Sequence, residues 1–195
     1  MKRFLDIVSS VLVLLLLLPV WLIIAIAIVA ESRGGVFYKQ IRVGKANRDF
    51  YLYKFRTMWT GADKKGLLTV GERDSRVTRV GYFLRKYKLD EFPQLINVLK
   101  GDMSIVGPRP EVRKYVDMYT PEQMRVLSVR PGLTDIASIQ YVHENELLAA
   151  SEDPEKTYIE EVMPAKLQLN LQYIDNQSVM GDIKLILQTF AAILH

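Results

Sequence analysis

Residues 7–30 read IVSSVLVLLLLLPVWLIIAIAIVA, a run of 24 residues without a charged side chain. A helix of about 20 apolar residues crosses the hydrocarbon core of a bilayer, which is roughly 30 Å thick. The run is therefore long enough to span a membrane, and a spanning helix is the first interpretation to test.

Pro19 lies near the middle of this run and opposes a straight span. Proline removes a helical N–H donor, and its ring clashes with the preceding turn, so we expect the helix to break there. The arms on either side, residues 7–18 and 20–30, contain 12 and 11 residues. At about 1.5 Å per residue, each arm reaches only about half of the hydrocarbon core.

The charges that flank the run favour the same side of the membrane at both ends. Lys2 and Arg3 precede the run, and Arg33 follows it. Because positive flanks prefer the cytoplasmic side, a straight span satisfies only one of them. A helix that breaks at Pro19 and returns to the same face satisfies both. We therefore expect residues 1–32 to form a re-entrant membrane anchor.

Two other interpretations of this segment remain open. A kinked helix could still span the bilayer. A cleaved signal peptide is the other, because Met1-Lys2-Arg3 resembles its basic start and Ala25-Ile26-Ala27 its cleavage site. Against cleavage, the apolar run is longer than the 7 to 15 residues typical of signal peptides.

The composition excludes several kinds of chemistry. The 195 residues favour one catalytic or binding domain with an anchor. There is no cysteine, which rules out disulfides, Cys-ligated zinc, iron–sulfur clusters and a thiol nucleophile. The only histidines, His143 and His195, are too few for a His-based metal site.

The net charge of +4 conceals two parts of opposite sign. Residues 1–116 contain 21 Lys or Arg and 10 Asp or Glu, a net +11, whereas residues 117–195 contain 5 and 12, a net −7. A basic surface attracts phosphates and anionic lipids. We therefore expect the first part to hold the sites that bind anions.

The pattern after the anchor predicts an α+β fold that is mostly helical. Aromatic-rich residues 36–40 and 50–55 indicate two strands of a small β-hairpin. Apolar spacing predicts amphipathic helices over 80–87 and 90–99, and mostly helical structure from Pro154 onward. We expect these elements to form a cytoplasmic catalytic domain, residues 33–195, on the membrane-embedded re-entrant helix.

Three signals refine this outline. The glycine-containing residues 60–75 are typical of a loop. Thr120, followed by Pro121 and Gln123, indicates a capped helix start. Gly101 is expected to end the helix over 90–99.

Asp90 and Glu91 are the strongest candidates for chemistry. They are adjacent carboxylates that follow Arg85, Lys86 and Lys88 at the predicted start of a helix. Acidic residues are common in first helical turns, where the dipole favours them, so the pair alone proves nothing. The surrounding cations make it informative, because guanidinium groups bind phosphates in bidentate fashion. These cations lie on a short strand or beside Gly or Pro: Lys54, Arg56, Arg85, Arg109, Arg113 and Arg130.

Cations beside one or two carboxylates, without a thiol, suggest chemistry on phosphate. Mg²⁺ uses one or two carboxylates and leaves its other positions to water and substrate phosphates. An Asp carboxylate can also attack phosphorus and form an aspartyl-phosphate. The residues alone therefore indicate a phosphotransferase at a membrane face.

Several short motifs follow one another along the chain: Lys2-Arg3-x-x-Asp6, the apolar segment broken at Pro19, Gln40-x-Arg42-Val43-Gly44, Tyr53-Lys54-Phe55-Arg56-Thr57-Met58, Leu89-Asp90-Glu91-x-Pro93-Gln94-Leu95-x-Asn97-Val98-Leu99-Lys100-Gly101-Asp102-Met103-Ser104, Val106-Gly107-Pro108-Arg109-Pro110 and Arg130-Pro131-Gly132-Leu133-Thr134. In this order they closely resemble the bacterial sugar transferases, the small monotopic phosphoglycosyl transferases. The resemblance covers the minimal catalytic unit of that family, without the extra transmembrane bundle of its larger members.

The resemblance implies a reaction and its partners. Sugar-1-phosphate would move from a UDP-sugar to polyprenyl (undecaprenyl) phosphate and release UMP, as the first membrane step of glycoconjugate assembly. In such enzymes the Asp of the pair is the nucleophile that carries the phosphosugar, with Mg²⁺ nearby. Asp90 matches this nucleophile and metal position, and Glu91 matches the neighbouring acid/base. The implied location is the cytoplasmic face of the bacterial inner membrane, with no nucleic acid as a partner.

The resemblance also implies which residues bind the substrate. The strand motif provides Lys54 and Arg56, and Arg85 precedes the pair, so these three are expected to neutralise the diphosphate. Arg109 and Arg130 are weaker candidates for phosphate binding. Their alternative role is structural, as donors to loop carbonyls.

The chain departs from the family pattern at two places. Members commonly have Ser before the membrane proline, where this chain has Leu18. The motif that begins at Arg130 usually continues Thr-Gly-Trp-Ala-Gln, whereas Asp135 follows Thr134 here. Asp135 is either a determinant of the donor sugar or a turn residue, and the turn is favoured.

Two other functions fit parts of the sequence. A membrane-tethered protein that binds anionic lipid without catalysis would also have a basic first part. A phosphohydrolase would use the same carboxylates to release sugar phosphate without a lipid acceptor. The sugar, the pathway and the oligomeric state are not specified by the sequence.

Overall fold

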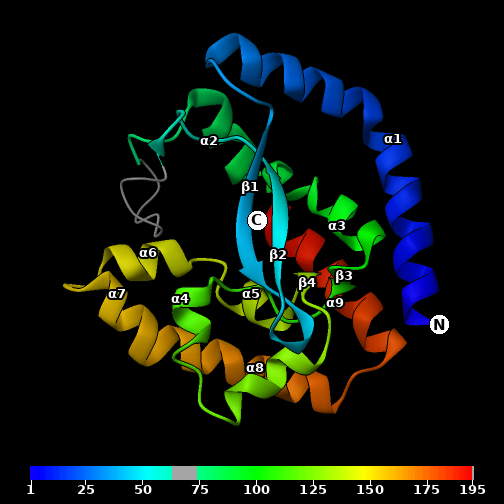
Figure 1. The fold of residues 1–195 in the computed structure, drawn as a ribbon, viewed down its shortest axis with the longest axis vertical. Coiled ribbons are helices and arrows are strands. Elements are labelled where there is room, and N and C mark those ends of the chain that lie inside the picture. Colours follow the sequence, from blue (N-terminus) through cyan, green and yellow to red (C-terminus); the bar gives the residue numbers. More distant parts are fainter. Residues whose placement is uncertain (63–73, 195) are drawn as a thin grey trace.

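The computed structural model describes residues 1–62 and 74–194. Helices predominate, and the strands form two small two-stranded sheets (Figure 1). The predicted α+β, mostly helical class is confirmed. Most of the loop predicted over residues 60–75 lies outside the described residues.

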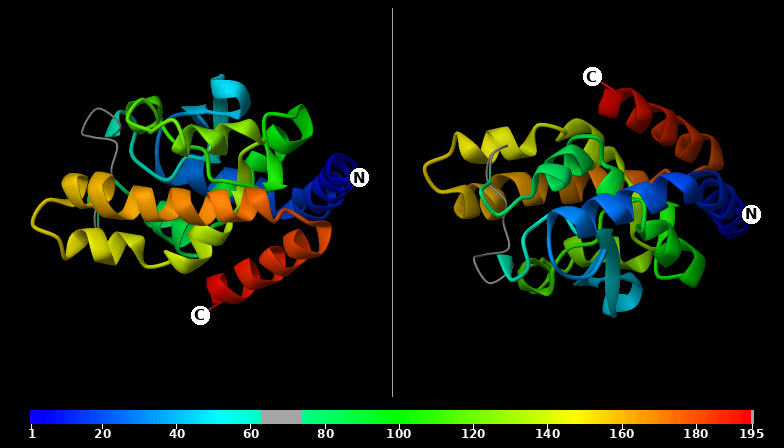
Figure 2. Two further views of the ribbon diagram at one scale, coloured as in Figure 1. Left: turned by 90° about the horizontal axis from the view of Figure 1, so that it is seen from below. Right: turned by 90° about the horizontal axis from the view of Figure 1, so that it is seen from above.

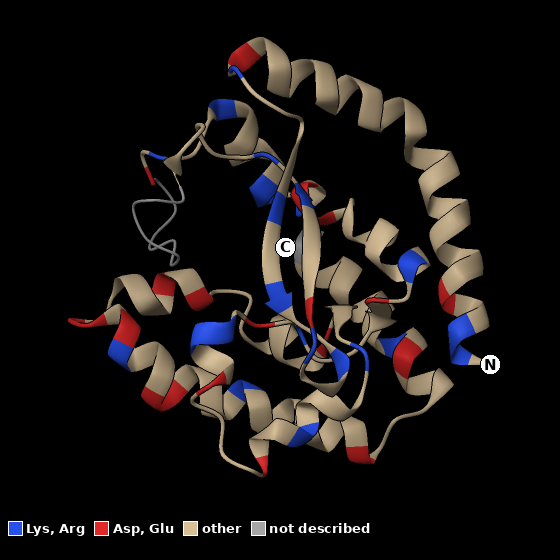
Figure 3. Ribbon diagram, in the orientation of Figure 1, with Lys and Arg blue, Asp and Glu red and all other residues tan. Residues whose placement is uncertain are grey.

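Helix α1, Lys2–Glu31, contains the apolar run and is, within the described ranges, the one helix long and apolar enough to cross a membrane. It is continuous, with Pro19 inside it, so the predicted interruption of the helix at Pro19 is not confirmed. Figure 1 nevertheless shows α1 bending sharply about halfway along its length. Its charged residues lie at its two ends, and the long middle part is uncharged (Figure 3).

The beginning of α1 is attached to the body of the protein. The Lys2 ammonium donates to the hydroxyl of Tyr173 at 3.0 Å and forms an ion pair with Asp182 at 2.5 Å. Buried Asp6 accepts hydrogen bonds from the Ser104 hydroxyl at 2.8 Å and the Ile105 amide at 3.1 Å. In both views of Figure 2 the N-terminus accordingly lies beside the turn between α8 and α9.

The end of α1 is attached to the same body. The Glu31 carboxylate accepts hydrogen bonds from the Arg79 amide at 2.7 Å and the Val80 amide at 2.8 Å, in the first turn of α2, Arg79–Lys86. Ile24 and Ile28 pack in one apolar cluster with side chains of the hairpin and of α2. Both ends of the long helix therefore contact one globular unit.

The predicted hairpin is confirmed, with longer strands than expected. Strands β1, Phe37–Val43, and β2, Asp49–Phe55, pair antiparallel. A short 3₁₀-helix, η1, Lys45–Asn47, closes the turn, with Ala46 and Asn47 at positive φ. This compact turn lets the strands extend beyond the ranges that their aromatic residues indicated.

The predicted helix over 90–99 is divided in two. A 3₁₀-helix, η3, Leu89–Glu91, precedes α3, Gln94–Lys100, and Pro93 lies between them. Pro93 lacks the N–H that would continue one α-helix through this point. Gly101 ends α3 at φ 92°, as expected. The helix predicted over 80–87 corresponds to α2.

A short parallel sheet was not predicted. Strand β3, Ser104–Val106, pairs with β4, Gly132–Thr134, so two proline-containing motifs far apart in the sequence lie side by side. The contact requires glycine, because a Cβ on Gly132 would lie 2.2 Å from the Gly107 nitrogen. This sheet places the segment that contains Arg109 near the centre of the molecule.

The remaining helices form one side of the body, where α8 packs against α5, η4 and η5 (Figures 1 and 2). The predicted capping-box hydrogen bonds are confirmed, since Thr120 and Gln123 exchange hydrogen bonds of 2.9 and 3.3 Å. The helix that follows is a 3₁₀-helix, however, and begins at Gln123 rather than at Pro121. The helices are α4 Arg113–Val116, η4 Gln123–Ser128, α5 Ile136–Gln140, α6 Glu144–Ala149, α7 Pro154–Thr157, the π-helix η5 Tyr158–Val162, α8 Met163–Asp175 and α9 Val179–Leu194.

Candidate active site

Asp90 and Glu91 lie in η3, directly after the turn that ends α2. Lys88 makes this turn with a positive φ of 55°, an uncommon conformation for a residue other than glycine. The two carboxylates are buried, with Asp90 6% and Glu91 8% exposed. A buried charge is costly unless it is paired, so the neighbours of each carboxylate determine what it can do.

Lys54 contacts both carboxylates. Its ammonium lies 3.1 Å from Glu91 Oε1 and 3.9 Å from Asp90 Oδ2. The neighbouring Phe55 is buried in the apolar cluster beside α1. Because side chains alternate along a strand, burial of Phe55 turns Lys54 to the other face of the hairpin, where η3 lies.

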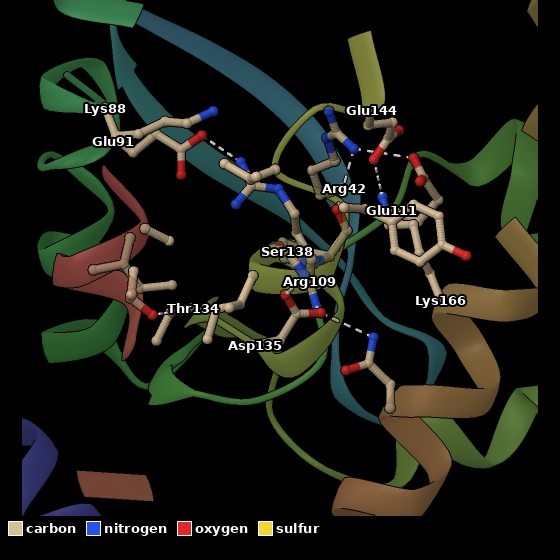
Figure 4. Close-up of a pocket in the computed structure, with 18 of the residues that line it drawn as sticks. Arg42, Lys88, Glu91, Arg109, Glu111, Thr134, Asp135, Ser138, Glu144 and Lys166 are labelled. Carbon is tan, nitrogen blue, oxygen red and sulfur yellow. Dashed lines mark hydrogen bonds and ion pairs between the residues drawn. The ribbon is translucent and has the colours of Figure 1, made fainter. Parts of the chain in front are cut away.

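Arg109 is the second partner of Glu91. Its guanidinium forms a close ion pair with Glu91 Oε1 (Figure 4). Its backbone N–H donates to Asp135 Oδ2 at 3.3 Å. The residue therefore joins the carboxylate pair to the loop that follows β4.

Arg85 approaches from α2. Its Nε donates to the Thr57 hydroxyl at 2.9 Å, and its positive charge acts on Asp90. Gly81 allows α2 to approach this closely, because a Cβ at this position would lie 2.0 Å from the Thr57 carbonyl oxygen. Lys54 in β2, Arg85 in α2 and Arg109 in the loop after β3 thus surround the two carboxylates from three separate segments.

The two carboxylates differ electrostatically. Burial raises the pKa of Asp90 above its ordinary value, although Lys54 opposes this shift. Burial also disfavours ionised Glu91, but the charges of Arg109 and Lys54 outweigh it and hold the pKa of Glu91 well below its ordinary range. In this arrangement Glu91 is ionised and held by two cations, and Asp90 is the less neutralised member of the pair.

The donor set fits a hard divalent cation only together with a substrate. Among the described residues, no group of three or more His, Asp or Glu side chains could hold a metal ion. Asp90 and Glu91 offer the one or two carboxylates that Mg²⁺ uses when phosphates and water complete its coordination. The site is therefore compatible with Mg²⁺ that arrives with a phosphate ligand.

A cavity of about 620 Å³ extends from Glu91 and Arg109 toward α5 and α8. Figure 4 shows Lys88 and Glu91 on one side of it, and Arg42, Glu111, Glu144 and Lys166 on the other. These four residues form two ion pairs. Arg42 lies 3.0 Å from Glu111, and Lys166 lies 2.6 Å from Glu144. Sequence reasoning missed this polar wall, because its residues come from distant elements without a shared motif.

Asp135 acts as a structural cap at the edge of the cavity. It is 1% exposed, and its Oδ1 accepts a hydrogen bond from the Ser138 amide at 2.7 Å, which caps α5. Its Oδ2 accepts from the Asn170 side chain at 2.9 Å. This arrangement agrees with the favoured turn role and adds a link to α8 that the sequence did not indicate.

Two of the predicted phosphate-binding residues contact backbone carbonyls. Arg56 donates to the carbonyls of Ser32 and Arg33, at 2.8 and 2.5 Å, and thereby holds the turn after α1. Arg130 donates to the carbonyl of Gly101 at 2.9 Å. The structure does not bring these two guanidinium groups into contact with the carboxylate pair, whereas it does bring Lys54 and Arg109 there.

Arg56→Met is expected to lower the free energy of unfolding by about 2–3 kcal/mol, because two charge-assisted hydrogen bonds to the carbonyls of Ser32 and Arg33 are lost. Thermal unfolding of purified protein measures this change. The variant Lys54→Met should also lose stability, because buried Glu91 would keep only one of its two cations. It should raise donor KM far more than Arg56→Met does, because Lys54 contacts the carboxylates rather than the end of α1. An Arg56→Met protein of normal stability with a strongly raised donor KM would contradict this division of roles.

Comparisons with known proteins agree with the motif order. The family model described as "Bacterial sugar transferase" matches residues 1–195. The chain is 41% identical to a UDP-N-acetylgalactosamine-undecaprenyl-phosphate N-acetylgalactosaminephosphotransferase of Aeromonas hydrophila, over 99% of this chain and 43% of that protein. It is 36% identical to the UDP-glucose:undecaprenyl-phosphate glucose-1-phosphate transferase of Caulobacter vibrioides, over 99% of this chain and 69% of that protein.

A third relative is closer in length. The uncharacterized sugar transferase EpsL of Bacillus subtilis is 38% identical over 100% of this chain and 87% of that protein. The chain thus spans less than half of the Aeromonas enzyme but most of the Bacillus protein. Since the family model and these relatives match the chain from end to end, it belongs to the bacterial sugar transferase family.

Proposed function

We propose that this chain is a phosphoglycosyl transferase that moves sugar-1-phosphate from a UDP-sugar to undecaprenyl phosphate and releases UMP. The observation that carries the proposal is the buried pair Asp90–Glu91, surrounded by Lys54, Arg85 and Arg109. The Aeromonas and Caulobacter relatives, whose names give undecaprenyl phosphate as a substrate, support it. The product, an undecaprenyl-diphosphate sugar, suits the first membrane step of glycoconjugate assembly.

The proposed reaction has two displacements at one phosphorus atom. In the first, an Asp90 carboxylate oxygen attacks the phosphorus that bears the sugar, and the bond to UMP breaks with its electron pair on UMP. In the second, a phosphate oxygen of undecaprenyl phosphate attacks the same phosphorus, and the Asp90 carboxylate leaves. Division into two steps lets one site serve first a soluble donor and then a membrane acceptor.

The cations would stabilise the charge that develops in both steps. Lys54 and Arg109 are already oriented by Glu91, and Arg85 by Thr57. Fixed donors that need no reorganisation are the main source of electrostatic catalysis. Glu91, held ionised by these two cations, would keep them in position, and we also propose it as the acid/base beside the nucleophile.

We propose Mg²⁺ as the cofactor, with Asp90 as its protein ligand beside the diphosphate. When bound, Mg²⁺ neutralises phosphate charge and orients the substrate. The 3.9 Å separation between Lys54 and Asp90 leaves the Asp90 carboxylate only loosely paired, which is compatible with this role.

We also propose that α1 is re-entrant, on the cytoplasmic face of the bacterial inner membrane. A straight helix of 30 residues would separate its ends by about 45 Å. Instead, Lys2 and Asp6 at one end and Glu31 at the other bind the same globular unit. The exposed, uncharged middle of α1 would then enter the bilayer, and the carboxylate pair would lie near the headgroups.

The topology has a direct test, because the chain contains no cysteine. We expect a cysteine inserted after Met1 and the variant Arg33→Cys to resist a membrane-impermeant maleimide in intact spheroplasts and to react after lysis. Tyr51→Cys on the exposed hairpin is the matched control for the cytoplasmic side. Labelling of only the N-terminal cysteine in intact spheroplasts would instead establish a spanning helix.

The function is tested by measuring UMP release from a panel of UDP-sugars by the full chain in detergent, with Mg²⁺ and undecaprenyl phosphate. We expect one or a few donors to give UMP in proportion to the undecaprenyl-diphosphate sugar formed. Release of sugar phosphate without the lipid would indicate a phosphohydrolase. No turnover with any donor, together with binding to anionic vesicles, would favour the lipid-binding alternative.

A further inference from the structure

We propose that the cavity between η3 and α8 holds the sugar of the donor, and that Asn170 selects that sugar. The inference rests on the proposed function and deepens it by assigning a residue for donor specificity. It is carried by the Asn170 side chain in the cavity wall, whose amide nitrogen donates a hydrogen bond and whose amide oxygen accepts none from the described residues.

Asn170 is 4% exposed and lines the cavity from α8. Its Nδ2 donates to Asp135 Oδ2 at 2.9 Å, but its Oδ1 is buried and has no hydrogen-bond partner among the described residues. A buried acceptor without a donor costs about 1–3 kcal/mol, so native proteins rarely retain one without a reason. A ligand group that donates a hydrogen bond would satisfy it.

The orientation of this amide is determined by Asp135. A carboxylate oxygen only accepts hydrogen bonds, so the Asn170 amide must present its NH₂ group to Asp135 and keep its oxygen on the other side. Asp135 is itself held by the Ser138 amide. Asn170 Oδ1 is therefore a fixed acceptor, which suits a sugar hydroxyl or the N–H of an acetamido group.

The cavity adjoins the reacting group through a short chain of contacts. Glu91 pairs with the Arg109 side chain, the Arg109 backbone N–H donates to Asp135, and Asp135 binds Asn170. Glu91, Arg109, Asp135 and Asn170 all line the same cavity. A phosphosugar on Asp90, the residue before Glu91, would thus have this space beside it.

The two-step reaction explains why the sugar, rather than the nucleotide, should occupy this cavity. UMP leaves from the position opposite Asp90, and the lipid phosphate must later attack from that same position. This position must therefore be accessible from the membrane. The sugar stays on the phosphorus throughout, so its compartment can be enclosed. Helices α5, α6 and α8 lie on the side of the molecule away from the bend of α1 (Figure 1), which matches such a compartment.

The test compares donors and UDP on the full chain. Asn170→Leu is expected to lower kcat/KM for the preferred UDP-sugar by about tenfold, the value of one good hydrogen bond. It should leave the inhibition constant of UDP, which has no sugar, within about twofold of the original protein. Asn176→Leu, at the exposed end of the same helix, is the matched control and should change neither quantity.

A second variant keeps the volume of the site and reverses its polarity. Asn can cap α5 as Asp does, so Asp135→Asn should keep the hydrogen bond from the Ser138 amide. Its NH₂ group would replace the oxygen that accepts from the Arg109 backbone N–H, so the readout is the ranking of donors rather than the absolute rate. Its new NH₂ group would turn the Asn170 amide around and present a donor to the cavity. A hydroxyl can accept as well as donate, whereas an acetamido N–H cannot. We therefore expect a changed ranking among UDP-glucose, UDP-galactose and their N-acetylamino counterparts.

The outcomes separate this inference from the proposed function. If the unaltered chain releases no UMP from any donor, the proposed function fails and the inference with it. If the chain is active but both Asn170→Leu and Asp135→Asn keep the ranking of donors and their kcat/KM, the sugar does not contact Asn170. If both variants weaken inhibition by UDP by the same factor as they lower kcat/KM for UDP-sugars, the nucleotide occupies the cavity instead, and the assignment is overturned.

Discussion

Asp90→Asn is expected to abolish turnover, with a fall in UMP release of about 10⁴-fold or more, as for other enzymes that lose their nucleophile. The substitution keeps the size of the side chain but replaces the attacking carboxylate oxygen by a much weaker amide oxygen. It also removes the proposed protein ligand of Mg²⁺. Because Asp90 is buried and only loosely paired with Lys54, we expect little loss of stability.

Covalent labelling tests the same substitution independently of turnover. The original chain, incubated with a UDP-sugar radiolabelled in the sugar and without lipid acceptor, should retain label on a denaturing gel. Hydroxylamine should release that label, as expected for an acyl phosphate, and Asp90→Asn should remain unlabelled. Glu91→Gln is the matched control, with slower labelling at an unchanged site. Substantial turnover by Asp90→Asn in membranes free of other sugar transferases would rule out the covalent mechanism.

Local patterns in the sequence predicted the elements that depend on neighbouring residues. The apolar run predicted α1, the aromatic-rich stretches predicted the β1–β2 hairpin, and Thr120 predicted capping-box hydrogen bonds that the structure contains. In each case the interaction that decides the structure spans less than about twenty residues.

The parts that were missed depend on contacts between distant residues. The pairing of β3 with β4 and the approach of Arg109 to Glu91 both follow from the close contact of Gly107 with Gly132. No local pattern encodes that contact. The contact of Arg56 with the turn after α1, 23 residues away, was likewise not predicted, and its role in phosphate binding stays a prediction.

The cavity also depends on contacts between residues that are distant in the sequence. Asn170 is one polar residue in a helical stretch, and nothing in its neighbourhood distinguishes it from an exposed asparagine. Its orientation depends on Asp135, 35 residues away. The sequence indicated two roles for Asp135, a turn residue or a determinant of the donor sugar. Through Asn170 the two roles become compatible.

Arg109→Met is expected to reduce kcat/KM for the donor by about 10²- to 10³-fold, the usual cost of losing one fixed donor to a developing oxyanion. It should also destabilise the protein by about 3–5 kcal/mol, because Glu91 would remain buried with one of its two cations removed. The pKa of Glu91 should rise, since the charge of Arg109 is the largest of the influences that lower it. Kinetics and thermal unfolding measure the two losses separately.

The double variant Arg109→Met/Glu91→Gln distinguishes a catalytic from a structural role of Arg109. Replacing Glu91 by the neutral, isosteric Gln removes the unpaired buried charge, so much of the lost stability should return. Activity should stay well below that of Glu91→Gln alone, because the guanidinium that would stabilise the phosphate is still absent. If activity recovers together with stability, Arg109 only balances Glu91. If stability recovers alone, the ion pair between Arg109 and Glu91 holds in place a cation that the reaction itself requires.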